Sequence, residues 1–322
     1  MAASTTATPD ASNNPCLPLP PITGRVAVAF SGGADSTALL LAAYEAYPDR
    51  IVAIHINHQL QAAAADFEVH CATTCRALAV PLEVRRVMVA CGPRQSLEAQ
   101  ARAIRYDTLA AVAKQVNAAV VLLAQHAQDQ LETVLIALSR GAGLPGLSGM
   151  APRFERGGVT FLRPILSVQG TQDRAWRDRF SHPYVDDPSN QDTQFTRNRI
   201  RHTVLPALEG ALPGIATAVA RTAQHVAQAQ VLLDELAAAD AVTVGVPPRI
   251  KDLQGLSEPR QANLLRWWLS GIPLATPSAA QLTELMGQVA ACTTRGHHIA
   301  TKAGAGAVVR DRDVLGFVNT PE

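Results

Sequence analysis

The sequence has few aromatic and few charged residues, and it contains no long hydrophobic run. Although 48% of its 322 residues are hydrophobic, none of its apolar stretches reaches the roughly 18 residues that a membrane-spanning helix requires. The N-terminus also lacks a basic region followed by an apolar one, which is the pattern of a secretory signal. We therefore expect a cytoplasmic protein without a membrane partner.

Cysteine is scarce, and its odd number fits a reducing compartment better than a disulfide framework. Cys71 and Cys75 are four residues apart beside His70, but no second Cys/His pair with zinc-finger spacing accompanies them. We expect buried or idle thiols here rather than a zinc site. The five cysteines are Cys16, Cys71, Cys75, Cys91 and Cys292.

Charge is balanced over the whole chain but not along it. The formal net charge is +1, yet ten arginines face six acidic residues between Arg140 and Arg201. Lysine is almost absent, so nearly all the positive charge is carried by guanidinium groups, which suit phosphate oxygens. The local excess of arginine favours contact with the phosphates of a nucleotide or an RNA. The alternative without a function is a solvated surface whose ion pairs contribute little.

The most informative motif is the hexapeptide Ser31-Gly32-Gly33-Ala34-Asp35-Ser36. An apolar run precedes it and a helix-like stretch follows it, so the glycines lie between a strand and the first free N–H groups of a helix. Hydroxyls of Ser31, Ser36 and Thr37 add donors, and Asp35 is placed to hold a metal that neutralises phosphate charge. The spacing matches neither a Walker loop nor a dinucleotide fingerprint. A nucleotide pyrophosphate site is predicted.

The first half of the chain alternates strand-like and helix-like segments. This pattern predicts a parallel sheet covered on both faces. Ligands of such sheets bind beyond the carboxyl ends of the strands, where the hexapeptide, residues 55–58 and residues 125–129 all fall. The predicted strands are Arg25–Phe30, Arg50–His58, Leu82–Val89 and Ala118–His126, and the predicted helices are Ser36–Ala46, Ala63–Leu78, Ser96–Val116 and Asp129–Arg140.

The pattern changes near residue 210. We expect a disordered tail over residues 1–21, a nucleotide-binding domain over 22–210 and a smaller α+β domain over 211–322. Trp267 and Trp268 lie in an apolar helix and are expected to pack in its core. Helices are predicted at Ile215–Ala239, Pro259–Ser270 and Ser278–Ala291, a break at Val242–Pro248, and strands at His297–Lys302, Ala307–Arg310 and Val314–Val318.

Two carboxylates follow the fourth predicted strand. Asp129 and Glu132 are three residues apart, so on a helix they share one side near its N-terminus. Favourable placement in the helix dipole explains such acids without any function. Their position beyond a strand end favours a functional role instead, either binding Mg²⁺ or accepting protons from an amine nucleophile.

Together these segments resemble the tRNA(Ile)-lysidine synthase family of PP-loop (N-type) ATP pyrophosphatases. The likeness implies a parallel-sheet PP-loop domain of the adenine nucleotide alpha hydrolase type, followed by a smaller α+β domain. It also implies ATP-dependent joining of L-lysine to C2 of the wobble cytidine in isoleucine tRNA with a CAU anticodon, and it weakly favours a homodimer. The matching segments are Ser31–Ser36, His55–Leu60, Ala101–Tyr106, Gln125–Thr133, Arg140–Met150, Leu162–Leu166, Asp187–Asn190 and Arg197–Arg201.

The resemblance also implies roles for individual residues. Asp35, Asp129 and Glu132 would be catalytic, and Mg²⁺ would lie on Asp35 and Asp129. Residues that would contact the substrate or a phosphate are His126, Arg197, Asn198 and Arg201. Residues that would contact ATP are Ser31, Gly32, Gly33, Ala34, Asp35, Ser36, His55, Asn57 and Arg102.

The chain departs from the usual family pattern before the acidic pair. Where the family commonly reads His-His-x-Asp-Asp-Gln, this sequence has Gln125-His126-Ala127-Gln128-Asp129-Gln130. A glutamine at 125 still forms hydrogen bonds, but it carries neither a proton nor a charge. The loss of an acid at 128 removes one metal ligand, which shifts metal and acid/base work onto Asp35, Asp129 and Glu132.

Other interpretations remain open at this point. Gly141–Gly146 spells G-x-G-x-x-G but follows a helix, so a flexible loop closing over the site, or an inert linker, fits better than a dinucleotide site. Another PP-loop enzyme, such as a tRNA thiolase or an amide-forming ligase, is an alternative function. The C-x-x-C pair typical of such thiolases is absent. A non-catalytic nucleotide- or RNA-binding module is the alternative of a different class.

Overall fold

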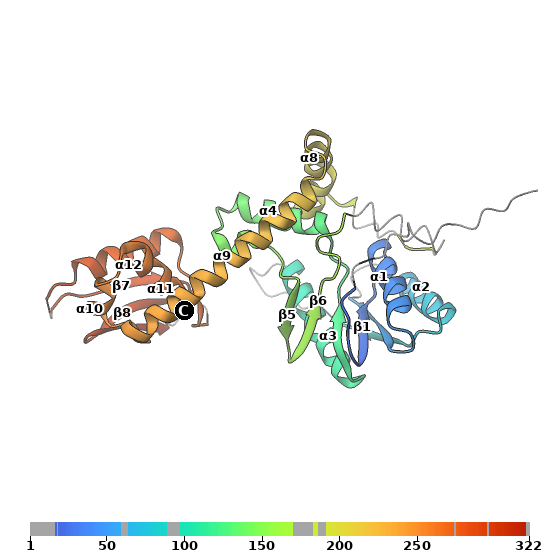
Figure 1. The fold of residues 1–322 in the computed structure, drawn as a ribbon, viewed down its shortest axis with the longest axis horizontal. Helices are drawn as coiled ribbons and strands as arrows, with labels where there is room; N and C mark the ends of the chain where they lie inside the picture. The colour runs from blue at the N-terminus through green and yellow to red at the C-terminus, as the bar shows by residue number, and fades with distance from the viewer. Residues whose placement is uncertain are drawn as a thin grey trace, which may run out of the picture. The chain divides into compact units, whose positions relative to one another are not determined.

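The computed structural model describes residue 17 and residues 19–58, 64–88, 97–169, 183–185, 191–273, 275–294 and 296–319 (Figure 1). Two compact units divide between His225 and Val226, inside the long helix α9, Ile215–Val244. The domain boundary at residue 210 expected from the sequence stays a prediction. Asp187–Asn190, Gln59 and Leu60 lie outside the described residues.

A six-stranded sheet forms the centre of the larger unit, in the order β3-β2-β1-β4-β6-β5. Five strands are parallel, and β5 pairs antiparallel with β6 at the edge. The four strands expected from the sequence are confirmed with slightly shorter bounds. The strands are β1 Arg25–Ala29, β2 Ile51–Asn57, β3 Leu82–Arg86, β4 Ala118–Leu122, β5 Arg153–Arg156 and β6 Val159–Leu162.

Helices cover both faces of this sheet, as the alternation of elements predicted. Buried side chains of α1 and α2 pack on one face, and those of α3 pack on the other. In α1 every residue from Ser36 to Ala43 is buried, which explains the continuous apolar run of that segment. The helices are α1 Ala34–Ala46, α2 Ala64–Ala77, α3 Leu97–Gln115 and α4 Ala127–Ser139.

A helical region beyond the sheet carries the arginine-rich segment. It runs without interruption from Thr196 to Ala211, with a π-helical turn in its middle. This turn moves Arg201 out of the register of a regular α-helix, and such turns are often found at functional sites. The region consists of α7 Thr196–Arg199, η3 Ile200–Val204 and α8 Leu205–Ala211.

The N-terminal segment is partly packed. Most of the tail expected to be disordered lies outside the described residues, but Leu17 is 4% exposed and joins a cluster with residues of α1 and with Ile165. The hydroxyl of Tyr47 donates a hydrogen bond to the carbonyl of Pro20. The expectation of disorder as far as residue 21 is therefore wrong at its end, because apolar side chains there reach the core.

The smaller unit has its own helices and an antiparallel sheet in the order β7-β8-β9. Helix α9 continues to Val244, so the break predicted from Val242 begins too early. Val244 is fully buried, and this packing outweighs the weak helix propensity of its β-branched neighbours. The other elements are α10 Ile250–Gln254, α11 Glu258–Ser270, α12 Ala279–Ala291, β7 Ala300–Ala303, β8 Gly306–Asp311 and β9 Val314–Asn319.

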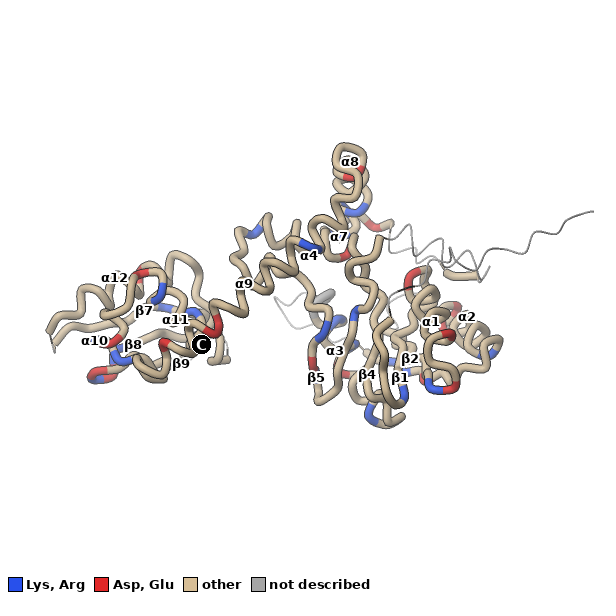
Figure 2. Tube along the Cα trace, viewed as in Figure 1, with Lys and Arg blue, Asp and Glu red and all other residues tan. Residues whose placement is uncertain are grey.

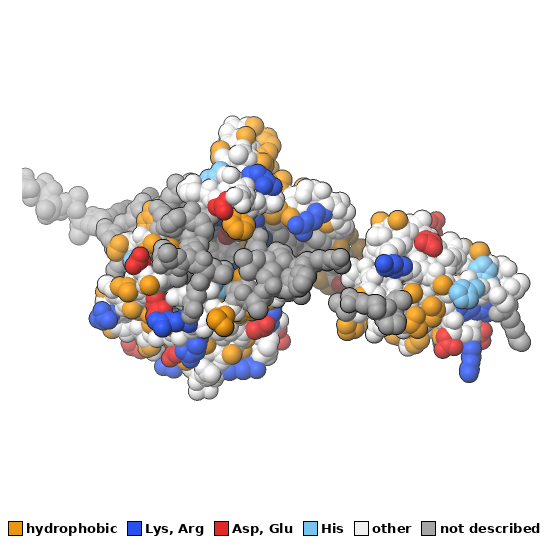
Figure 3. Space-filling model, turned by 180° about the vertical axis from the view of Figure 1, so that it is seen from behind, with side chains coloured by type: hydrophobic (Ala, Val, Ile, Leu, Met, Phe, Trp, Pro, Cys, Tyr) orange, Lys and Arg blue, Asp and Glu red, His pale blue; other side chains and the backbone are white. Residues whose placement is uncertain are grey.

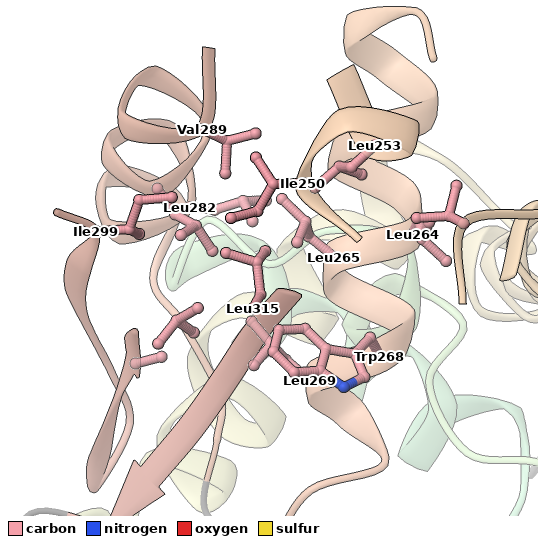
Figure 4. Close-up of a cluster of buried hydrophobic side chains, with 14 of the residues drawn as sticks. Ile250, Leu253, Leu264, Leu265, Trp268, Leu269, Leu282, Val289, Ile299 and Leu315 are labelled. Atoms are coloured by element: carbon pink, nitrogen blue, oxygen red, sulfur yellow. The ribbon is translucent and has the colours of Figure 1, made fainter. Parts of the chain in front are cut away.

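One cluster of buried side chains joins these helices and strands (Figure 4). Trp268 is 7% exposed within this cluster, and Trp267 packs against it. The prediction that both tryptophans serve the core is therefore confirmed. Within the described part of the chain no single helix is long and apolar enough to cross a membrane; only the bent pair Thr196–Ala211 and Ile215–Val244 reaches that length and composition.

Candidate active site

The hexapeptide forms a tight turn between β1 and α1. Gly32 has a φ of +84°, a left-handed conformation that glycine adopts without strain. Gly33 is the N-cap of α1. The turn is closed by Ser36 Oγ, which lies 3.0 Å from Ser31 Oγ and accepts a hydrogen bond from the Ser31 amide at 3.2 Å. This strand–turn–helix geometry is the one that the sequence predicted for a phosphate site.

The hydroxyl groups of the turn do different work. Thr37 is fully buried, and its hydroxyl donates to the Gly33 carbonyl at 2.9 Å. Ser36 is 5% exposed and donates to the same carbonyl at 3.0 Å. Thr37 is therefore less accessible to a phosphate than the exposed Ser31, and its donation to phosphate stays a prediction. Ser31 is exposed, so a ligand can reach its hydroxyl, although that hydroxyl lies 3.0 Å from Ser36 Oγ.

His126 links the turn to the acidic pair. It is the N-cap of α4, and its Nδ1 accepts a hydrogen bond from the Gln128 amide at 3.2 Å. The proton of the neutral ring is therefore on Nε2, which lies 3.6 Å from Asp35 Oδ2 and 3.7 Å from Asp129 Oδ2. The Asp35 side chain is 48% exposed and that of His126 is 12% exposed. The structure thus brings the three predicted residues together at the carboxyl ends of β1 and β4.

The acidic pair binds Arg201. The guanidinium Nε lies 2.7 Å from Glu132 Oε1, and Nη2 lies 3.0 Å from Asp129 Oδ1 and 3.1 Å from Glu132 Oε2. The Glu132 side chain is fully buried, and burial raises the pKa of its carboxyl even though Arg201 opposes this shift. Because the charged pair is desolvated on one side, its partners are strongly coupled.

The predicted arginine cluster divides into two groups. Arg197 and Arg201 face α4; Arg197 Nη2 donates to Thr133 Oγ1 at 3.4 Å, and its Nη1 lies 3.9 Å from Glu132. Asn198 and Arg199 instead donate to carbonyls of the preceding loop, at Asp192 and at Thr193. The division follows helical geometry, since residues four apart share a face. Contact of this cluster with phosphate stays a prediction.

Figure 2 shows acidic and basic positions next to one another around α4 and α7. On the face of each unit that Figure 3 shows, hydrophobic, basic and acidic side chains are interspersed.

His55 and Asn57 lie at the end of β2, next to the turn. His55 is 4% exposed, its Nδ1 lies 2.9 Å from the Phe30 carbonyl, and burial lowers its pKa. The neutral ring therefore supports the end of β1. Asn57 is 7% exposed and donates to Glu68 Oε2 at 3.1 Å. Both residues brace the site, and direct contact with ATP stays a prediction.

The buried thiols lie behind the turn. Cys71 Sγ is 3.4 Å from His55 Nδ1, and Cys71, Cys75 and Cys292 are all buried free thiols. Burial raises the pKa of Cys71 and of Cys75 to about 12. The prediction that Cys71 and Cys75 are buried is confirmed; Cys16 and Cys91 lie outside the described residues.

The glycine-rich segment after α4 contains helical structure. It contains the short helix α5, Leu144–Leu147, and its end is bound by Gln130, which is 2% exposed. Gln130 Oε1 accepts from the Met150 amide at 2.8 Å, and its Nε2 donates to the Met150 carbonyl at 3.2 Å. Gly149 has a φ of +63°, and a Cβ there would lie 2.8 Å from the Gln130 amide group. The segment is therefore partly helical and hydrogen-bonded at its end, and its closing over the site stays a prediction.

The described residues contain no group of three or more His, Cys, Asp and Glu side chains arranged to hold a metal ion. Mg²⁺ usually binds only one or two carboxylates together with substrate phosphates. The half-exposed Asp35, at the N-terminus of α1, fits an ion that arrives with a nucleotide. Asp129 already binds Arg201, so it is the weaker candidate.

The fold and the site together define a PP-loop enzyme. A family model described as a PP-loop domain matches residues 13–208, and the chain belongs to that family. The solved structure of the U34-tRNA thiolase NcsA from Methanococcus maripaludis has a TM-score of 0.54 at 15% identity, covering 63% of this chain and 72% of that one. This likeness shows the shared fold.

A second family model, for the TilS substrate binding domain, matches residues 249–315. The chain is 53% identical over 283 residues to the tRNA(Ile)-lysidine synthase of Polaromonas naphthalenivorans, covering 88% of this chain and 86% of that protein. It is 39% identical over 305 residues to the enzyme of the same name from Bordetella pertussis, covering 91% and 95%. It spans only 56% of the length of the Burkholderia pseudomallei relative, at 43% identity. The chain belongs to the tRNA(Ile)-lysidine synthase family, which are tRNA-modifying ligases.

Proposed function

We propose that the chain uses ATP to join L-lysine to C2 of the wobble cytidine in isoleucine tRNA with a CAU anticodon, releasing AMP and pyrophosphate. The observation that carries the proposal is the juxtaposition of a phosphate-type turn with a carboxylate pair through His126, whose Nε2 lies 3.6 Å from Asp35 and 3.7 Å from Asp129. One half of this site suits an anion and the other half suits an amine.

In the first step the C2 oxygen of the cytidine attacks the α-phosphorus of ATP. The new O–P bond forms as the bond to the bridging oxygen breaks, and pyrophosphate leaves. The N–H groups at the start of α1 and the exposed Ser31 hydroxyl are placed to stabilise the charge that develops on phosphate oxygens. Asp35 would hold Mg²⁺, which neutralises phosphate charge when bound.

In the second step the lysine side-chain amine attacks C2 of the adenylated base. A C–N bond forms, the C2–O bond to AMP breaks, and the amine loses a proton. Asp129 and Glu132 are placed to orient the amine and accept that proton, and Arg201 between them suits the carboxylate of the amino acid. Burial raises the pKa of Glu132, which favours the uptake of a proton by this carboxyl.

The tRNA contact belongs to this proposal as well. The wobble base must be splayed out of its loop to reach the turn, as is usual when proteins read single-stranded RNA. The match of residues 249–315 to a substrate binding domain supports a role of the smaller unit in holding the tRNA. A homodimer and a cytoplasmic location complete the proposal.

Incorporation of radiolabelled lysine tests the proposed function. The chain is incubated with ATP, labelled lysine and a CAU-anticodon isoleucine tRNA transcript, and label is counted in the RNA. A transcript whose wobble cytidine is replaced by uridine is the matched control. Label that depends on the cytidine and on ATP is the expected result. No incorporation alongside normal ATP binding would overturn the proposal and favour another PP-loop chemistry.

A further inference from the structure

Arg163 is a buried cation whose partners among the described residues are all uncharged. It follows β6 and is 6% exposed. Its Nε donates to Gln125 Oε1 at 3.0 Å, its Nη2 donates to the Tyr106 hydroxyl at 3.2 Å, and its Nη1 donates to the Ala151 carbonyl. The guanidinium also lies 4.4 Å from the centre of the Phe154 ring. Burial lowers its pKa, but an arginine so placed keeps its charge.

Tyr106, a residue of α3, links Arg163 to Arg102 of the same helix. It is 4% exposed, and its hydroxyl accepts hydrogen bonds from Arg163 and, at 3.4 Å, from Arg102 Nη2. Arg102 and Arg105 lie 5.4 and 5.5 Å from the centre of its ring. Burial raises the pKa of the Tyr106 hydroxyl, but the surrounding guanidinium groups together lower it by more, so the net shift of the pKa is downward. Arg156 lies 5.8 Å from the centre of the same ring, so four arginines converge on a single tyrosine.

Most of the positive charge of this group has no acidic partner among the described residues. Within the described part of the chain, Arg102, Arg105 and Arg163 form no ion pair. Only Arg156, which packs on the same ring, has a carboxylate partner, Asp107, on the exposed side. A cluster of like charges held together without acids favours an anionic ligand.

The group borders the candidate active site. Gln125 precedes His126, the cap of α4. Arg102 contacts the sulfur of Met150, which Gln130 of α4 holds. Arg105 is close enough to Arg197 to have its pKa lowered by that charge, in addition to the larger effect of burial.

We propose that Gln125, Arg163 and Tyr106 are positioning residues that hold Arg102 for a phosphate group of a ligand. The uncharged amide at 125 orients Arg163 without neutralising it, so the positive charge of the cluster stays available to that phosphate. The choice of ligand, ATP or the tRNA backbone, rests on the proposed function. An acid at position 125 would pair with Arg163 and cancel the attraction.

The substitution Gln125→Glu tests this directly, because it keeps the shape of the side chain and adds one negative charge. Gln115→Glu is the matched control: Gln115 Oε1 accepts from Arg85 Nη2 at 2.9 Å on the exposed surface, at the opposite end of α3. Dissociation constants are measured for ATP without tRNA and for the tRNA without ATP, each over a range of salt concentrations. Thermal unfolding of each variant is followed in parallel.

We expect Gln125→Glu to unfold at the same temperature as the unmodified protein or higher, and to bind a phosphate ligand about tenfold more weakly. Weaker ATP binding assigns the phosphate to the nucleotide. Weaker tRNA binding with a shallower salt dependence assigns it to the RNA backbone. Gln115→Glu should change neither constant by more than about twofold.

Unchanged binding of both ligands by folded Gln125→Glu would overturn the proposal. If that variant does not fold, Tyr106→Phe decides instead, since it removes only the hydroxyl that joins Arg163 to Arg102; unaltered ATP and tRNA binding by it would overturn the proposal equally. These binding measurements involve no lysine transfer. A failure of the unmodified chain to incorporate lysine would therefore count against the proposed function alone.

Discussion

Arg201 Nε lies 2.7 Å from Glu132 Oε1, although the two residues are 69 positions apart in the chain. The carboxylate is fully buried, whereas the arginine side chain is 39% exposed. The pair fastens the π-helical turn η3 to α4, and it places a cation against the two carboxylates proposed to receive the amine. The amine must therefore share these carboxylates with Arg201 or displace it.

Replacing Glu132 by glutamine should change the pH dependence of stability. Because burial raises the folded-state pKa of Glu132 above its ordinary value, the folded protein holds this proton more tightly than the unfolded chain does. Its contribution to stability is therefore fully present below the unfolded pKa and is lost as pH rises through the raised, folded pKa. Glu132→Gln should lack this loss, as measured by urea unfolding from about pH 4 to about pH 8.

The matched control for that measurement is Glu155→Gln, since the Glu155 side chain is 70% exposed. For each variant, the free energy of unfolding is subtracted from that of the unmodified protein at every pH. If the two differences depend on pH in the same way, the raised pKa of Glu132 is contradicted.

Lysine incorporation by Glu132→Gln should fall by about a hundredfold or more, the usual effect of losing a general base.

Replacing Asp35 by alanine should leave the fold intact and slow the reaction. The side chain is 48% exposed, so its loss changes the free energy of unfolding little. Turnover should fall by at least about a hundredfold, as expected when charge stabilisation at a phosphate is removed. Asp35→Asn, which keeps the shape, should be similarly slow in single-turnover kinetics. Near-normal rates in both variants would show that another carboxylate does this work.

Replacing Gly32 by alanine should damage the turn. Gly32 has a φ of +84°, and a Cβ there would lie 3.1 Å from Cys71 Sγ and 3.2 Å from His70 Cδ2. Gly24→Ala is the control, because Gly24 has a φ of +85° but its nearest neighbour would be an ordinary 3.5 Å away. Both variants should lose about 1–2 kcal/mol through backbone strain.

Gly32→Ala should lose more stability than that control and should also bind ATP at least about tenfold more weakly. Chemical denaturation and equilibrium dialysis measure the two effects. Equal losses of stability in both variants would mean that the side chains of Cys71 and His70 move aside to make room for the added Cβ.

The two kinds of hydroxyl in the turn should separate binding from stability. Thr37→Val removes a buried hydrogen bond to the Gly33 carbonyl and should cost about 1 kcal/mol of stability, with ATP affinity within about twofold of normal. Ser31→Ala removes an exposed hydroxyl and should weaken ATP binding about fivefold with little effect on unfolding. A reversed pattern would show that the turn rearranges when the nucleotide binds.

The thiols behind the turn should resist alkylation in the folded protein. With a pKa of about 12 for Cys71 and for Cys75, only roughly one in ten thousand of these groups is ionised at about pH 8, and the thiolate is the reactive form. Iodoacetamide should therefore label both residues only after unfolding, as read by peptide mass mapping. Rapid labelling of the native protein would contradict this burial.

The strands and helices of the first half were predictable because apolar runs of strand length alternate with amphipathic or buried helices. β5 and β6 were missed: three of the four residues of β5 are charged, since this edge strand has an exposed face. The continuation of α9 to Val244 was missed because packing, not propensity, extends it.

Within the site, Asp35, His126 and Asp129 were predictable because each belongs to a motif at the end of a parallel strand. Gln130 and Arg163 were missed as functional supports. The sequence signal for Arg163 was present in the segment Leu162–Leu166, but only the structure shows its contacts with Gln125 and Tyr106.

Thus the sequence alone determined the phosphate-type turn at Ser31–Ser36, the sheet that carries it and the family to which its motifs point, because these follow from short-range patterns. Only the tertiary structure decided which charges meet. Arg201 pairs with Glu132, and Arg163 binds neutral partners, because the partner of a guanidinium group is chosen by packing between segments far apart in the chain.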